Sequence, residues 1–154
     1  MTSPPRRPTV GRIVAPEAGF GVQSSELASR LGVGEGSLRA ARWLAWRALR
    51  AGKLRRAADI AAGCVALSPS DAWSWRLLAE IRLRERRAAE AWRAADQAAA
   101  AGADPVWMGW LKARARILSG DFQGARQELQ AARRMRGAPD ARRAAEALLR
   151  RWAR

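Results

Sequence analysis

Apolar residues recur at the three- and four-residue spacing of amphipathic helices over most of the chain after residue 37. The spacing predicts a first helix over 37–51, with Ser37 as its N-terminal cap. A second helix is predicted over 54–67, and it ends before Pro69 because proline cannot continue a helix. Gly52 supplies the turn between the two helices, so the pattern predicts a helical pair.

The pattern repeats when the chain is shifted by thirty-four residues, because small residues then fall into register. Trp73 also recurs as Trp107, and Gly52 recurs as Gly120 ahead of a short turn. Small residues allow two helices to approach closely, so each column predicts a helix crossing. The columns are Ala45, Ala79 and Ala113; Ala57, Ala91 and Ala125; and Cys64, Ala98 and Ala132.

A period near thirty-four with small residues at helical spacing is typical of tetratricopeptide repeats. We therefore predict an all-α fold, a right-handed superhelical solenoid of three tetratricopeptide helix pairs and a C-terminal capping helix. In the capping helix, Ala144, Leu148 and Trp152 are predicted to share the face that packs on the repeats. The predicted domains are residues 1–36, a flexible leader with a short helix near 24–31; residues 38–71, 72–105 and 106–139, the three repeats; and residues 140–154, the capping helix.

Repeat three is the least regular of the three repeats. Gly109 and Lys112 occupy positions where the repeat pattern has tryptophan and leucine. A register shifted by one residue, with Trp110 at the large-residue position, is an alternative that the pattern leaves open. In repeat two, Gly102, Ala103 and Pro105 are predicted to end the second helix.

The composition argues against an enzyme. The chain has no His and no Tyr, which removes the commonest general base and metal ligand, and no pair of carboxylates stands out. Its single cysteine, Cys64, excludes an internal disulfide and a cysteine-based metal cage, and is predicted to be a buried, inert thiol. We expect no catalytic residues, no cofactor and no metal. There is neither a membrane-span-length apolar run nor a signal-peptide core, which predicts a cytoplasmic protein.

The chain is strongly basic, with a formal net charge of +15 from 29 Lys and Arg against 14 Asp and Glu. Only Lys53 and Lys112 are lysines. Such a surface attracts nucleic acid, an anionic membrane or an acidic protein. Alternatively, the arginines have no binding role and stand wherever the fold tolerates a solvated positive charge.

In a tetratricopeptide solenoid the first helix of each pair lines a concave groove, the usual ligand surface. The thirty-four-residue frame places five of the eight tryptophans on that surface, with arginines between them. The predicted binding residues are Arg39, Arg42, Trp43, Trp46 and Leu49 in repeat one; Trp73, Arg76, Leu77 and Glu80 in repeat two; and Trp107, Trp110 and Arg114 in repeat three. Leu83, Leu111 and Ile117 fall at the remaining groove positions of the same frame.

Trp and Arg are enriched where proteins bind other proteins, so this surface predicts a protein or peptide partner with apolar anchors and acidic flanks. A nucleic-acid partner is the alternative, with bases stacked on Trp and phosphates held by Arg. Residues 26–42 add to that alternative because they are similar to a bacterial helix-turn-helix, with Gly32 in the turn and Leu38 in the recognition helix.

A narrower resemblance is carried by Ser37, Leu44-Ala45-Trp46, Gly52-Lys53, Gly63-Cys64-Val65-x-Leu67 and Asp71. This arrangement resembles the tetratricopeptide chaperones of type III secretion translocators. The resemblance implies a cytoplasmic chaperone that holds a hydrophobic secreted protein in its groove, with Trp43, Trp46, Leu49, Trp73 and Leu77 as groove residues. It also implies a homodimer formed through the N-terminal helix at residues 22–31.

Overall fold

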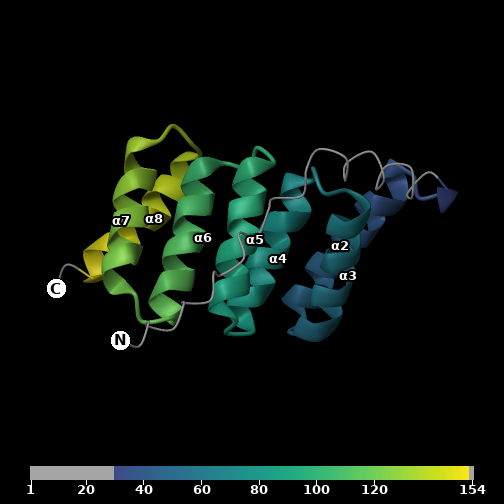
Figure 1. Ribbon diagram of the computed structural model, residues 1–154, viewed down its shortest axis with the longest axis horizontal. Coiled ribbons are helices and arrows are strands. Elements are labelled where there is room, and N and C mark those ends of the chain that lie inside the picture. The colour runs from purple at the N-terminus through teal and green to yellow at the C-terminus, as the bar shows by residue number, and fades with distance from the viewer. Residues whose placement is uncertain (1–29, 153–154) are drawn as a thin grey trace, which may run out of the picture.

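The structure is a computed structural model that describes residues 30–152 of the chain. Within these residues every regular element is an α-helix, and the helices stand side by side in chain order, from α2 and α3 at one end to α7 and α8 at the other (Figure 1). This arrangement confirms the predicted all-α solenoid. The helices are α2 (Glu35–Arg50), α3 (Leu54–Leu67), α4 (Ala72–Arg84), α5 (Ala88–Ala100), α6 (Pro105–Leu118), α7 (Phe122–Arg134) and α8 (Pro139–Trp152).

The three columns of small residues lie at the crossings of these helices. All nine residues of the columns are buried, from Ala45, Ala57 and Cys64 in the first pair to Ala132 in the third. Small side chains at a crossing shorten the distance between helix axes, which is why the same positions recur in each pair. Ala113 is fully buried in its column, so repeat three keeps the unshifted thirty-four-residue register.

Close packing of α6 on α7 explains why repeat three has Gly109 where the repeat pattern has tryptophan. A Cβ atom added at Gly109 would lie 2.7 Å from the Cβ of Ala132 on α7. The two helices approach so closely here that only hydrogen fits in place of the tryptophan of repeat two, Trp75. Trp75 instead packs beside the core and donates its indole N–H to the carbonyl of Pro69 at 2.8 Å.

Aspartates begin three of the helices. Asp71, Asp104 and Asp121 each accept hydrogen bonds from backbone N–H groups in the first turn of α4, α6 and α7. Of two sequence predictions about helix ends, one was wrong and the other was right only in part. Ser37 caps nothing, because α2 begins at Glu35 with Gly34 as its cap residue. α5 ends at Ala100, just before Gly102, as predicted. Pro105 lies beyond that end and opens α6 at its first position, where a missing N–H costs nothing.

The turn inside each helix pair needs a left-handed residue. Gly52, Arg86 and Gly120 occupy the same repeat position and have φ angles of 73°, 61° and 81°. Glycine adopts this region without steric cost, whereas arginine does not. Arg86 therefore carries backbone strain in the middle repeat.

The capping helix packs on α6 and α7 through a face that includes Leu148, as predicted, and is centred on two alanines. Ala141 and Ala145 are buried, and Leu148 packs on the cluster formed by Ala113, Ala125 and Leu129. Ala144 and Leu148, two of the residues predicted to share the packing face, are half-buried beside these alanines. The predicted contact of Trp152 lies outside the described side chains.

Two further predictions concern other parts of the chain. Residues 1–29 of the predicted leader lie outside the described residues, and with them most of the short helix near 24–31. Arg30 is helical, a turn follows it, and Glu35 and Gly36 already belong to α2. None of the helices within residues 30–152 is both long and apolar enough to cross a membrane. The predicted limits of the three repeats, 38–71, 72–105 and 106–139, stay a prediction.

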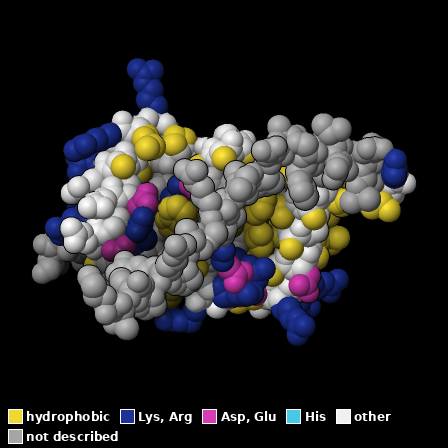
Figure 2. Space-filling model, in the orientation of Figure 1, with side chains coloured by type: hydrophobic (Ala, Val, Ile, Leu, Met, Phe, Trp, Pro, Cys, Tyr) yellow, Lys and Arg dark blue, Asp and Glu magenta, His cyan; other side chains and the backbone are white. Residues whose placement is uncertain are grey.

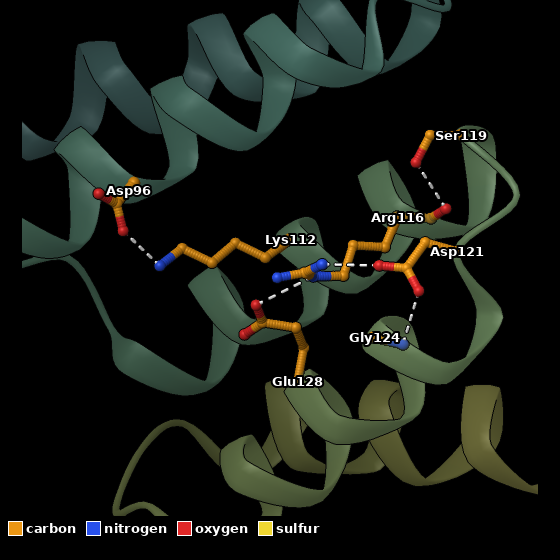
Figure 3. Close-up of polar contacts among 7 residues, drawn as sticks. All are labelled: Asp96, Lys112, Arg116, Ser119, Asp121, Gly124 and Glu128. Carbon is orange, nitrogen blue, oxygen red and sulfur yellow. Dashed lines mark hydrogen bonds and ion pairs between the residues drawn. The ribbon is translucent and has the colours of Figure 1, made fainter. Parts of the chain in front are cut away.

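Ion pairs link α5, α6 and α7 (Figure 3). Lys112, which replaces a leucine of the repeat pattern, reaches back to Asp96 with a nitrogen–oxygen distance of 2.5 Å. Arg116 pairs with Asp121 at 2.7 Å and with Glu128 at 3.2 Å. The backbone N–H of Gly124 and then the Arg116 guanidinium lower the pKa of Asp121 below its ordinary value.

Candidate functional site

The first helices of the three pairs, α2, α4 and α6, line a hollow of about 320 Å³, which we call the groove. Its floor consists of buried leucines, Leu49, Leu77 and Leu111, one from each helix. Tryptophans and charged side chains form the walls. The other residues that line the groove are Trp46, Arg50, Trp73, Arg76, Glu80, Arg84, Trp107 and Trp110.

A second hollow of about 510 Å³, which we call the cup, continues the groove at its N-terminal end. Trp46 and Trp73 line both hollows, so the two form one continuous surface. The remaining residues of the cup are Arg39, Arg42 and Trp43. The structure thus brings the predicted binding residues together, and whether they bind a partner stays a prediction.

Arg114 is the one predicted residue that lines neither hollow. Its guanidinium lies 4.4 Å from the ring centroid of Trp110, and its Nη1 is 2.9 Å from Glu80 Oε2. It therefore holds two groove residues, Trp110 and Glu80, in place from α6. Ile117, also placed at a groove position by the repeat frame, instead packs with the cluster next to α7 and α8. Leu83 is buried in the main core.

Three large apolar side chains are unusually open to solvent at this surface. The exposed fractions are 54% for Trp43, 40% for Trp46 and 39% for Trp73. Figure 2 shows hydrophobic side chains on the face at α2 and α4, with basic and acidic side chains beside them. Exposed apolar surface of this kind, bordered by polar groups, is typical of a binding site.

Each groove helix holds arginine guanidinium groups over indole rings. Two rings, Trp107 and Trp110, also meet edge to face, with centroids 5.2 Å apart and planes at 81°. Cation–π contacts of this kind restrain both side chains before any partner arrives. The pairs and their guanidinium-to-centroid distances are Arg47 with Trp43, 4.7 Å; Arg50 with Trp46, 5.2 Å; Arg76 with Trp107, 5.5 Å; and Arg114 with Trp110, 4.4 Å.

Several charges at the surface are already neutralised within the fold. Arg42 pairs with Asp71 at 2.8 Å and with Glu35 at 3.1 Å. Glu80, the carboxylate that lines the groove, pairs with Arg114 and, at 3.6 Å, with Arg84. These ion pairs fix side chains that would otherwise be mobile.

Sequence reasoning missed two groove arginines, Arg50 and Arg84. Each lies four residues after a predicted groove residue, Trp46 or Glu80, and so one helical turn further along the same face. That spacing was the signal that could have found them.

Cys64 lies in the core and takes no part in the groove. Burial raises the pKa of the Cys64 thiol, and the positive charge of Arg42 opposes this only partly. A buried thiol with a raised pKa is poorly reactive, as predicted for a packing residue.

Comparisons with solved structures support the arrangement of helices. The type III secretion translocator chaperone SycD of Yersinia enterocolitica superposes with a TM-score of 0.69 at 17% identity, over 79% of this chain and 94% of SycD. A chain of a type III secretion complex from Aeromonas hydrophila superposes with a TM-score of 0.73 at 18% identity. The superposition covers 84% of this chain and 87% of the Aeromonas chain. The chain has the tetratricopeptide fold.

The same likeness extends beyond secretion chaperones. The N-terminal domain of stress-induced protein-1 (STI-1) from C. elegans superposes with a TM-score of 0.62 at 18% identity, over 73% of this chain and 94% of that domain. No family model and no curated protein matches the chain. At these identities the comparisons show the fold, and they confirm the resemblance of the tetratricopeptide array to the translocator chaperones at that level.

Proposed function

We propose that this protein is a non-catalytic chaperone or adaptor that binds a segment of a partner protein in the groove and the cup. The observation that carries the proposal is the set of exposed tryptophans, Trp43, Trp46 and Trp73, beside a floor of buried leucines. Cation–π contacts restrain Trp43 and Trp46, so this apolar surface can accept apolar side chains without first rearranging.

A narrower form of the proposal is a cytoplasmic chaperone of type III secretion. SycD, one of the similar folds, has been solved in complex with a peptide of the translocator YopD, with a TM-score of 0.66 to this chain. This supports a peptide as the occupant of the groove. In this form the protein acts as a homodimer through residues near 22–31, as the resemblance implies.

The competing proposal is a nucleic-acid-binding protein, favoured by the net charge of +15. The groove fits it less well, because its floor is aliphatic and one wall carries the carboxylate of Glu80. A nucleic-acid site would show a steep loss of DNA or RNA affinity as salt rises. Absence of any gel shift at low salt would remove this alternative.

The peptide-binding proposal is tested with Trp46→Ala and Trp73→Ala. A pull-down from the native host in moderate salt, read by mass spectrometry, identifies the partner, and the affinity of each variant for it is then measured by titration. We expect each substitution to weaken binding by about 1 kcal/mol or more, roughly fivefold, because buried tryptophans dominate such interfaces.

Met135→Ala is the matched control, since Met135 is an exposed apolar side chain that lines neither the groove nor the cup. Its affinity should equal that of the native protein, and circular dichroism should show the same helix content for all three variants. Unchanged affinity in both tryptophan variants would mean that the partner binds elsewhere.

A further inference from the structure

The arginines that line the groove differ in whether the fold already neutralises them. Arg84 is paired with Glu80, and Glu80 is paired in turn with Arg114. Arg50 and Arg76 form no ion pair with any Asp or Glu among residues 30–152. Among the described residues 30–152, the groove therefore contains two positive charges without a counter-charge.

Those two arginines are also held in position. Arg50 lies over Trp46 and Arg76 lies over Trp107, so each guanidinium rests on an indole face. The ring lies on one side of each guanidinium, and the N–H groups directed away from the ring can bind a carboxylate with two hydrogen bonds. Because the stack has already fixed the side chain, less rotamer entropy is lost when an anion binds.

Resting on the proposed function, we propose that the groove selects partner segments in which acidic side chains lie next to apolar ones. Arg50 and Arg76 receive the carboxylates, while the apolar side chains pack on Leu49, Leu77 and Leu111. Glu80 limits this preference because it neutralises Arg84 and Arg114. Glu80 is thus a residue that sets the specificity of the groove, with an effect opposite in sign to that of the two arginines.

The groove favours a carboxylate-bearing peptide over a nucleic acid. Its floor consists of three buried leucines, which match the aliphatic side chains of a peptide rather than the flat face of a base. Trp107 and Trp110 already contact each other and an arginine each, so they offer less free ring surface for stacking.

The test uses synthetic peptides of equal length that share the same leucines and carry Glu, Gln or Lys between them. Each peptide bears a fluorescent label, and its affinity for the full-length protein is read by fluorescence anisotropy at low and at high salt. We expect the Glu peptide to bind most tightly and the Lys peptide least tightly, with the difference shrinking as salt rises.

Three variants locate the preference. Arg50→Gln and Arg76→Gln should each weaken binding of the Glu peptide roughly fivefold, the size of a partly exposed ion pair, and leave the Gln peptide unchanged. Glu80→Gln should strengthen binding of the Glu peptide by a similar factor, because it frees Arg84 and Arg114. Arg55→Gln on α3 is the matched control, with the same loss of charge at an exposed position away from the groove.

The outcomes separate this inference from the proposed function. Equal binding of the Glu and Gln peptides, or an equal effect of Arg55→Gln and Arg76→Gln, would overturn the acidic preference and leave a purely apolar groove. Displacement of the Glu peptide by an equal concentration of a single-stranded oligonucleotide would assign the arginines to nucleic acid instead. Failure of the host partner to depend on Trp46 and Trp73 is the separate result that removes the proposed function.

Discussion

Arg86 replaces the glycine found at the same turn position of the other two repeats, yet its backbone keeps the conformation of those glycines. It lies between Gly52 and Gly120 in the thirty-four-residue frame and adopts the same left-handed conformation, with φ of 61°. For a residue with a Cβ this conformation costs about 1–2 kcal/mol. The turn keeps its shape because the packing of α4 on α5 requires it, and the residue bears the strain.

Replacing this arginine with glycine should stabilise the protein. Arg86→Gly removes the steric cost, and only part of the gain is lost to the greater freedom of glycine in the unfolded chain. We expect the free energy of unfolding to rise by about 1 kcal/mol, measured by urea unfolding. Arg86→Ala keeps the Cβ and serves as the control, so a comparable gain there would rule out relief of backbone strain as the cause.

Between elements, repeat three differs from repeat two in the residue at the crossing of α6 and α7. Repeat two has Trp75 at the position where repeat three has Gly109, and α7 occupies the space that the missing side chain leaves. Gly109, which departs from the repeat pattern in the sequence, is thus required by the close approach of α6 and α7 at Ala132.

A substitution at this crossing should reverse the usual preference of helices for alanine. Gly109→Ala gains about 1 kcal/mol of helix propensity but forces its Cβ against Ala132, at a cost of about 1–3 kcal/mol. We expect a net loss in the free energy of unfolding, read by thermal and urea unfolding.

Gly63 in α3 is the matched control, because nothing lies within 4 Å of a Cβ added there. Gly63→Ala should stabilise the protein by about 0.5–1 kcal/mol. If both alanines stabilise the protein, the close approach of α6 and α7 is not a tight constraint.

On the scale of the whole molecule, each helix pair buries its apolar face only against a neighbour, so the end of the array needs a cap. α8 supplies it, because Ala141 and Ala145 are fully buried against α6 and α7. Its outward side carries arginines, among them Arg142, Arg143 and Arg150, which keep that end of the array polar.

Disrupting this cap should destabilise the whole array. Ala145→Glu places a carboxylate among apolar side chains without a partner and should lower the free energy of unfolding by about 3 kcal/mol or more. Ala147→Glu, on the exposed side of the same helix, is the matched control and should leave it almost unchanged. Size-exclusion chromatography with light scattering would also show whether the first variant aggregates. Equal stability of the two variants would show that the array folds without α8.

Much of the fold could be predicted because the same spacing of small residues recurs in all three repeats. The columns that begin at Ala45, Ala57 and Cys64 identify helix crossings, and those crossings fix which face of each helix turns inward. The placement of Trp43 and Trp73 at one surface followed from that geometry. Helix ends were less predictable, because Ser37 and Pro105 each satisfy more than one local rule, and packing decides between them.

The sequence by itself determined the repeat, the pairing of the helices and the side on which the tryptophans gather, since these depend on spacing along one chain. Tertiary structure alone decided the electrostatics of the groove. Arg114 and Glu80 are thirty-four residues apart and meet only when α6 packs beside α4. Arg50 and Arg76 form no ion pair within the part of the chain that the structure describes. No spacing rule distinguishes these arginines, because the distance between charges on different helices exists only once the helices are packed.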